Sequence, residues 1–307
     1  MNTSLLKPVA LYSADHAKGW IPWGALAPFL CLVLVVAPSL GAENLLEYLG
    51  LLDAKGDAVG FNGLVALLLF PFSMMALAVV VWVLLVERRS LATAGLVGRW
   101  GAAKFVLGHA IGLITICAVV GAIWLAGGLE AGEPWKAAQS PDALMRIGIL
   151  LVCFAVQSSA EEFVFRGWLL SAIARKFNVA LAVVLSSMVF SLLHYGPGQP
   201  WLVTLGTFLF GLFACAWALK AGSIWGVMGW HAGWNWLLAT GFELPVTGLD
   251  ADVPALLVHL TAIGPRELTG GAQGPEGSLF CLLFFAGAIG WLMWRSRGHP
   301  DASSATA

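Results

Sequence analysis

The sequence carries little charge. Only 11% of its 307 residues are Asp, Glu, Lys or Arg, while 59% are hydrophobic and the mean hydropathy is +0.85. A soluble domain usually carries about 25% charged residues, so these values exclude one and indicate a membrane protein built from many helices. The net charge is −1 and no stretch is rich in Lys and Arg, so we expect no nucleic-acid partner.

Three motif classes are also missing. The cysteines lie far apart in apolar runs, without Cys-x-x-Cys spacing: Cys31, Cys117, Cys153, Cys215 and Cys281. We therefore expect buried thiols and no disulfide framework. The sequence has no His-Glu-x-x-His, which weakens the case for a zinc protease. It also has no internal repeat of the kind that inverted-repeat transporters show.

Long apolar runs dominate what is present. A bilayer span needs about 20 mostly apolar residues, and the predicted fold is therefore all-α, a polytopic membrane helix bundle of about eight transmembrane helices. The expected spans are 20–40, 61–86, 105–127, 146–168, 179–195, 201–220, 223–242 and 278–294. The fourth is expected to continue as helix to Arg175. The polar first 20 residues show no clear cleavage site, so we expect an uncleaved first helix.

Lys and Arg are unequally divided between the two sides of these spans. Eleven lie on the side of the termini: Lys7, Lys18, Arg88, Arg89, Arg99, Lys104, Arg175, Lys176, Lys220, Arg295 and Arg297. Four lie on the other side: Lys55, Lys136, Arg146 and Arg266. Because short cytoplasmic loops are enriched in Lys and Arg, we expect both termini in the cytoplasm, and the protein in the bacterial inner (plasma) membrane.

The fourth span is interrupted by Glu161, Glu162 and Arg166. A charged side chain at the centre of a bilayer helix costs roughly 2.5–3.5 kcal/mol and marks a functional site by default. Glu162 and Arg166 are four residues apart, in the favourable order for an intrahelical ion pair. Glu161 is left without an intrahelical partner. A lone carboxylate in apolar surroundings is a plausible general base near neutral pH.

Two further polar patterns lie in other spans. His194 follows Phe190 by four residues in the fifth span, and His231 and Asn235 share one helix face in the seventh. An imidazole can orient a water or bind a metal, and an Asn amide can donate hydrogen bonds to a developing oxyanion. The three patterns together predict one buried polar site. The remaining histidines are not assigned to it: His16, His109, His259 and His299.

At these residues the chain resembles the CPBP family of intramembrane proteases, which includes the CAAX prenyl endopeptidases and bacterial Abi-like proteins. The family motifs are Glu-Glu-x-x-x-Arg, Phe-x-x-x-His and His-x-x-x-Asn on successive membrane helices. All three are intact and in order here. The resemblance covers residues 147–242, and the stretch 270–276 before the last span is similar to bacterial members.

The resemblance implies an all-helical membrane core that hydrolyses a peptide bond in a membrane-embedded or membrane-tethered protein or peptide. Glu161 would be the general base on a water that His194 helps to position. His231 and Asn235 would stabilise the tetrahedral oxyanion, with the Glu162-x-x-x-Arg166 pair in support. The mechanism requires no cofactor.

Three alternatives remain open. In the first, the same hydrolysis uses zinc, held by Glu161, His194 and His231 with an open fourth position. In the second, the ionisable residues form the proton relay of a transporter. In the third, the protein is a non-catalytic membrane adaptor or immunity protein. The sequence identifies neither the substrate, prenylated CAAX protein or other, nor the side of the membrane to which the site opens.

For the organisation of the chain we expect one integral membrane domain over 1–307. Residues 1–145 form N-terminal scaffold helices, because the first three spans are poor in polar residues. Residues 146–242 form the catalytic core helices. Residues 243–307 form an outer loop, rich in Gly and Pro, and the last helix.

Overall fold

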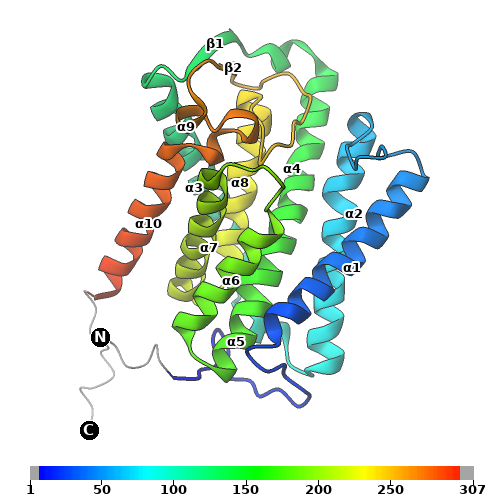
Figure 1. The fold of residues 1–307 in the computed structure, drawn as a ribbon, viewed down its shortest axis with the longest axis vertical. Helices are drawn as coiled ribbons and strands as arrows, with labels where there is room; N and C mark the ends of the chain where they lie inside the picture. Colours follow the sequence, from blue (N-terminus) through cyan, green and yellow to red (C-terminus); the bar gives the residue numbers. More distant parts are fainter. Residues whose placement is uncertain (1–6, 298–307) are drawn as a thin grey trace.

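A computed structural model describes residues 7–297 of the chain. Long helices running along a common axis make up most of it (Figure 1). The helices are α1 (Ala27–Tyr48), α2 (Gly60–Val81), α3 (Gly101–Leu125), α4 (Pro141–Glu162), α5 (Leu170–Lys176), α6 (Val179–Leu193), α7 (Trp201–Ala221), α8 (Trp225–Phe242), α9 (Arg266–Thr269) and α10 (Leu279–Arg297). The predicted all-α polytopic membrane bundle is confirmed.

A helix lies at each of the eight expected spans. The stretches long and apolar enough to cross a membrane are Ala27–Tyr48, Gly60–Val86, Gly101–Leu125, Pro141–Lys176 and Trp201–Ala221, and Val179–Leu193 and Leu279–Trp294 are shorter apolar helices. The bounds predicted for the first span, 20–40, are wrong, because α1 occupies Ala27–Tyr48. Pro22 and Gly24 precede the helix, whereas Pro28 is tolerated in its first turn.

α4 and α5 are parts of one continuous helix, Pro141–Lys176, so the predicted continuation of the fourth span to Arg175 is confirmed. Between them, Phe163–Leu169 forms a π-helical segment. The sequence did not predict this widened turn. Short π segments inside α-helices occur frequently at functional sites, and this one begins directly after Glu161 and Glu162.

Two carbonyl groups of the π segment accept hydrogen bonds from side chains elsewhere in the chain. The hydroxyl of Ser186 on α6 donates to the carbonyl of Phe165 at 2.8 Å. The hydroxyl of Tyr12 donates to the carbonyl of Arg166 at 2.6 Å. Tyr12 belongs to the N-terminal segment, which packs beneath α5, where the amide of Val9 donates to the carbonyl of Ala174. The N-terminal segment thus stabilises the widened turn.

α8 is held in place by close contact with α3, where glycines replace larger side chains. A Cβ on Gly229 would lie 1.9 Å from the carbonyl oxygen of Phe105, and one on Gly233 would lie 2.4 Å from that of His109. No larger residue fits at either position without separating the helices. Small residues at such contacts let membrane helices approach closely. This contact fixes the rotation of α8, the helix that contributes two of the expected site residues.

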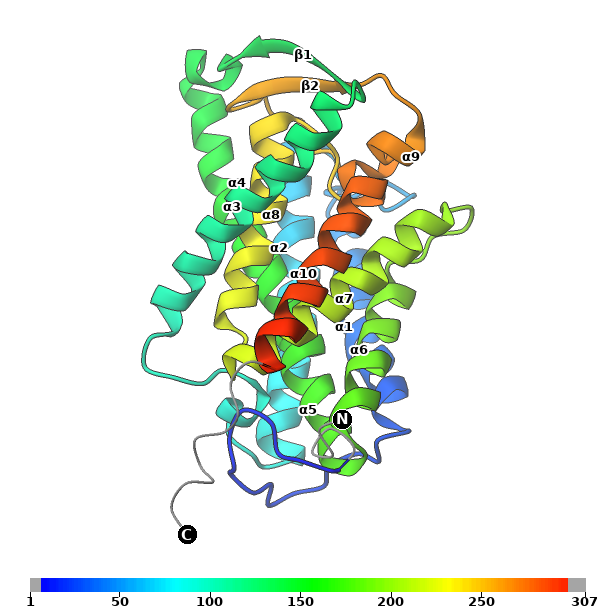
Figure 2. The same ribbon diagram turned by 90° about the vertical axis from the view of Figure 1, so that its left-hand side faces the viewer.

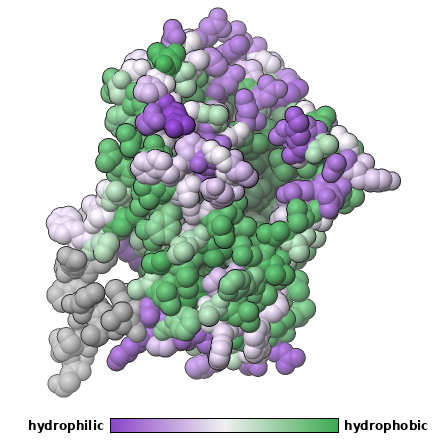
Figure 3. Space-filling model, viewed as in Figure 1, coloured by the Kyte–Doolittle hydropathy of each residue, from purple (hydrophilic) through white to green (hydrophobic). Residues whose placement is uncertain are grey.

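A two-stranded antiparallel ribbon covers one end of the bundle, remote from α5 (Figures 1 and 2). It pairs β1 (Leu129–Pro134), between α3 and α4, with β2 (Val258–Ala262), between α8 and α10. The sequence analysis predicted no strand. We call this the ribbon end and the opposite one the α5 end. On the face that Figure 3 shows, hydrophilic side chains gather at both ends, and apolar ones cover the waist between them.

A buried ion pair lies at the α5 end. Glu87 and Arg89 are paired there, 0% and 3% exposed. The carboxylate of Glu87 accepts hydrogen bonds from the indole N–H groups of Trp82 (3.1 Å) and Trp168 (2.8 Å), and Arg89 donates to the hydroxyl of Ser171 (3.0 Å). The sequence placed Arg89 in a connection between spans, where burial was not expected.

The cysteines are free, and four of them are buried as expected. Cys117 is the exception, because it lies on the exposed face of α3. That face belongs to the apolar waist, where large side chains such as Val106, Leu107 and Ile114 are also exposed. In a bilayer this surface contacts lipid.

Candidate active site

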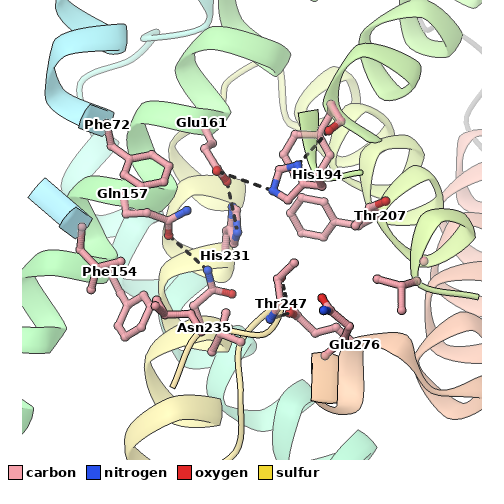
Figure 4. A pocket seen from close by; sticks show the side chains of 18 of the residues that line it. Phe72, Phe154, Gln157, Glu161, His194, Thr207, His231, Asn235, Thr247 and Glu276 are labelled. Atoms are coloured by element: carbon pink, nitrogen blue, oxygen red, sulfur yellow. Dashed lines mark hydrogen bonds and ion pairs between the residues drawn. The ribbon is translucent and has the colours of Figure 1, made fainter. Parts of the chain in front are cut away.

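A cavity of about 330 Å³ lies inside the bundle. Side chains from α1, α2, α4, α6, α7, α8 and α10 line it, together with the connection between α8 and α10 (Figure 4). The lining includes Phe190 and the four residues predicted to be catalytic, Glu161, His194, His231 and Asn235. The three polar patterns, far apart in the sequence, therefore converge at one cavity.

Glu161 faces both imidazoles. Its Oε1 lies 3.8 Å from Nε2 of His194, and its Oε2 lies 3.7 Å from Nε2 of His231. Both separations exceed hydrogen-bond length. The residue is 5% exposed, and Oε2 has no hydrogen-bond partner within residues 7–297. Glu161 therefore presents to the cavity a buried carboxylate with an oxygen that has no hydrogen-bond partner among the described residues.

Each imidazole is fixed through its other ring nitrogen. Nδ1 of His194 lies 2.8 Å from the carbonyl oxygen of Phe190, and Nδ1 of His231 lies 2.9 Å from Oε1 of Glu162. Because both partners are acceptors, Nδ1 must carry the proton in each ring, and Nε2 of a neutral ring is then an acceptor. Both Nε2 atoms point toward Glu161.

The predicted ion pair between Glu162 and Arg166 is present. Nη1 of Arg166 lies 3.0 Å from Oε1 of Glu162, and both side chains are fully buried. The same Oε1 accepts from His231, so the pair positions one imidazole of the site. The guanidinium stacks on the rings of Phe190 (4.2 Å to the centroid) and Phe210 (4.9 Å). These two rings line the cavity, so they separate the positive charge from it.

Gln157 is a site residue that sequence reasoning missed. It lies one helical turn before Glu161 on the same face of α4 and lines the cavity. Its Oε1 accepts from Nδ2 of Asn235 at 3.2 Å and from the hydroxyl of Ser158 at 3.0 Å. Oδ1 of Asn235 is buried without a partner in the described part of the chain. A Gln four residues ahead of Glu161 in an apolar span was the signal that could have identified it.

Two more carboxylates line the same cavity. Glu276 lies in the connection before α10, where it accepts from the indole N–H of Trp234 (3.1 Å) and from the backbone N–H and hydroxyl of Thr247 (2.8 and 2.7 Å). Glu43, on α1, is half-buried and has no hydrogen bond or ion pair to any described residue. The sequence assigned neither to the site, although Glu276 ends the stretch 270–276 noted above.

The site offers donors of the types that zinc prefers, one carboxylate and two imidazoles. Among residues 7–297, however, no three His, Cys, Asp or Glu side chains are arranged to hold a metal ion. As expected, His16, His109 and His259 do not line the cavity. His299 lies outside the described residues.

Comparison with known families identifies one segment. Residues 143–237 match the family model described as Type II CAAX prenyl endopeptidase Rce1-like. The matched segment runs from the start of α4 into α8 and contains all three motifs, so the predicted resemblance is confirmed there. No curated protein and no solved structure matches the chain.

Proposed function

We propose that the chain, whose residues 143–237 match a family of membrane endopeptidases, hydrolyses a peptide bond of a membrane-associated substrate. One observation supports this above all others. A single cavity is surrounded by groups from three different spans: a carboxylate with an unpaired oxygen, two imidazole acceptors and a side-chain amide. These are the groups needed to activate a water and to stabilise an oxyanion.

In this mechanism Glu161 removes a proton from the attacking water. The gaps of 3.7–3.8 Å between its carboxylate and the two Nε2 atoms are lengths that a bridging water spans. Such a water donates one hydrogen to Glu161 and the other to Nε2 of His194 or His231. Its oxygen lone pair is then free to attack the substrate carbonyl. The proton held by Glu161 passes to the leaving amine.

Asn235 is the proposed donor to the oxyanion. Its Nδ2 carries two hydrogens, of which one is directed at Gln157, so the second is available to the substrate. Gln157 fixes the direction of that amide. His231 was expected to share this role, but its Nδ1 is bonded to Glu162. It donates to an oxyanion through Nε2 only when the ring is protonated.

The direct test compares peptide products in membranes that contain wild type or Glu161→Gln, identified by mass spectrometry. General-base catalysis contributes about 10²–10⁴-fold, so we expect the products to disappear in the variant. Glu161→Gln preserves the shape of the side chain, and an unchanged unfolding temperature would show that the fold persists. Cleavage at the wild-type rate would disprove the mechanism.

The zinc-dependent version of the same hydrolysis remains the alternative for the cofactor. It is favoured by the two Nε2 atoms that face Glu161. Elemental analysis of purified, active protein separates the versions. A stoichiometric metal ion that is lost together with activity and restores it on return would replace the metal-free proposal.

The two non-proteolytic alternatives make different demands on the same residues. A transporter predicts proton-coupled flux in liposomes that Glu161→Gln abolishes. A non-catalytic adaptor predicts full biological activity in a Glu161→Ala, His194→Ala double variant. Neither outcome is expected of a protease.

We further propose that both termini lie in the cytoplasm of a bacterial inner membrane, with the ribbon end outside. Since the connection between α8 and α10 lines the cavity, the site is then reached from the outer side. Asp250→Cys in that connection should react with an impermeant maleimide in intact cells, whereas Lys176→Cys at the α5 end should not. The protein without an added cysteine gives the background labelling of its native cysteines. Labelling of Lys176→Cys but not of Asp250→Cys would show the opposite topology.

A further inference from the structure

The cavity is acidic beyond what water activation requires. Its ionisable lining consists of Glu43, Glu161 and Glu276, besides the two histidines. No Lys or Arg lines it in the part of the chain that the structure describes. The nearby Arg166 is bonded to Glu162 and covered by two aromatic rings. The negative charge of the cavity is therefore left for a ligand to balance.

The free atoms of the lining point to the same kind of ligand. Glu43 has no partner among the described residues, so its whole carboxylate is available. Glu276 accepts three hydrogen bonds, and a carboxylate has room for about four. Oε2 of Glu161 and Oδ1 of Asn235, on side chains less than 10% exposed, also lack donors. All of these atoms are acceptors, so the complementary ligand brings hydrogen-bond donors.

The rest of the wall is apolar. Leu67, Leu68 and Phe72 from α2 and Phe154 from α4 line it beside Gln157. Figure 4 shows Phe72 and Phe154 on one side of the site and Glu276 with Thr247 on another. A peptide that fits has apolar side chains for this wall and a cationic side chain that the carboxylates of Glu43 and Glu276 can balance.

We propose that the substrate carries Lys or Arg within about three residues of the scissile bond, and that Glu43 and Glu276 determine this specificity. The inference rests on the proposed function and adds the substrate class. A chain that ends three residues after the bond, as a CAAX motif does, reaches at most about 10–11 Å beyond it. Its terminal carboxylate would enter a cavity lined by carboxylates, where like charges repel. Such a substrate is disfavoured.

Binding and cleavage are measured with the full chain in lipid nanodiscs. The probes are fluorescent peptides with one apolar membrane segment of about 20 residues, amidated at the C-terminus, in which Lys, Gln or Glu is placed at each position near the segment end. A free-acid farnesylated CAAX peptide completes the set. We expect Glu161→Gln to bind the best Lys peptide about tenfold more tightly than its Glu counterpart.

The specificity residues are tested by changes in that ratio. Adding Glu43→Gln should lower the Lys-to-Glu ratio to about threefold or less, because one of two charges is removed. Glu276→Gln should act in the same direction, but it also disturbs Thr247, so Glu43 is the cleaner position. Glu47→Gln, one turn away on α1 at an exposed position outside the cavity lining, is the matched control and should leave the ratio unchanged.

The outcomes distinguish this inference from the proposed function. Equal binding of Lys and Glu peptides, or tightest binding of the free-acid CAAX peptide, overturns the inference. Cleavage that depends on Glu161 but proceeds at the same rate whatever the peptide charge also overturns the inference. That result would still support the proteolytic function. A Lys preference that Glu43→Gln lowers and Glu47→Gln leaves unchanged supports the site, whereas one that Glu43→Gln leaves unchanged overturns the role of Glu43. If wild type then cleaves no bound peptide, the proteolytic function is what fails.

Discussion

Two buried Glu–Arg pairs lie in the described part of this bundle, and one of them holds an imidazole that lines the cavity. At the α5 end, both carboxylate oxygens of Glu87 accept hydrogen bonds, from two indoles and from Arg89. At the candidate site, Oε2 of Glu162 has no partner among the described residues, and Oε1 is shared between Arg166 and His231. Both carboxylates are completely buried.

The difference shows what separates an ion pair with a structural role from one that would support the proposed reaction. Neither pair lines the cavity itself, and the carboxylate of Glu87 is bonded only to two indoles and to Arg89 among the described residues. Glu162 instead also accepts from His231, whose other ring nitrogen lies 3.7 Å from Oε2 of Glu161. Burial and charge alone therefore do not identify an active site. Unsatisfied atoms that line a cavity, as those of Glu161 and Asn235 do, are the stronger indication.

Removing the structural pair should have the largest effect, on stability alone. Glu87→Ala takes the acceptor from two indoles and leaves Arg89 buried without a counter-charge. Losing one partner of a buried pair costs about 3–5 kcal/mol, so we expect the free energy of unfolding to fall by that amount. Cleavage per folded molecule should be unchanged. Glu130→Ala, at an exposed position, is the control. An unchanged unfolding transition for Glu87→Ala would contradict the structural role assigned to this pair.

Asn235→Ala should show the opposite pattern. Loss of one oxyanion donor lowers kcat by about 10²–10³-fold, equivalent to about 2.7–4 kcal/mol of barrier. The unfolding transition should move less than in Glu87→Ala. Steady-state kinetics and thermal unfolding of the same preparation give both numbers. Asn44→Ala, exposed on α1, is the control. If Asn235→Ala unfolds the protein and folded molecules remain active, Asn235 belongs with the structural residues.

Gln157→Ala should lie between these two cases. The variant removes the acceptor that orients Nδ2 of Asn235 but leaves the amide itself in place. We expect kcat to fall about tenfold, because the net free energy of one hydrogen bond corresponds to a factor of about this size. KM should stay nearly constant. A purely structural Gln157 would instead lower stability and leave kcat alone. The exposed Gln139→Ala provides the reference.

The spans and the motifs could be predicted because both are local properties of the sequence. Hydropathy over about 20 residues locates a membrane helix, and a spacing of four places Glu162 beside Arg166 and His231 beside Asn235. The convergence of the three patterns followed from the cost of burying charge in a membrane. The predicted start of α1 was wrong because hydropathy does not detect that the helix begins only after Pro22 and Gly24.

The remaining features depend on contacts between distant segments. β1 and β2 pair across more than a hundred residues, and the π segment is stabilised by Tyr12 and Ser186 from elsewhere in the chain. Gln157 had a local signal in its spacing from Glu161, but the place of Glu276 at the cavity is visible only once the segment before α10 is packed beside α8. No local pattern encodes contacts between such distant segments, so sequence reasoning did not predict them.

The smallest expected effect concerns the hydroxyl of Tyr12, which joins the N-terminal segment to the carbonyl of Arg166. Burial raises the pKa of Tyr12 well above its usual value of 10.0, with the neighbouring Cys215 and Glu162 adding to the shift. At pH 7, Tyr12→Phe should lower the free energy of unfolding by about 1 kcal/mol, because one hydrogen bond is lost.

Above pH 10 the two proteins should converge. There the unfolded chain loses the phenolic proton while the folded protein keeps it, so wild type loses stability by up to about 1.4 kcal/mol per pH unit, a slope that Tyr12→Phe lacks. Unfolding measured from pH 8 to 11 tests this, with Tyr48→Phe, whose side chain is 87% exposed, as the control. A stability difference that stays constant across this range would mean that Tyr12 is not held in its protonated form by the fold, and the link between the N-terminal segment and the π segment would lose its support.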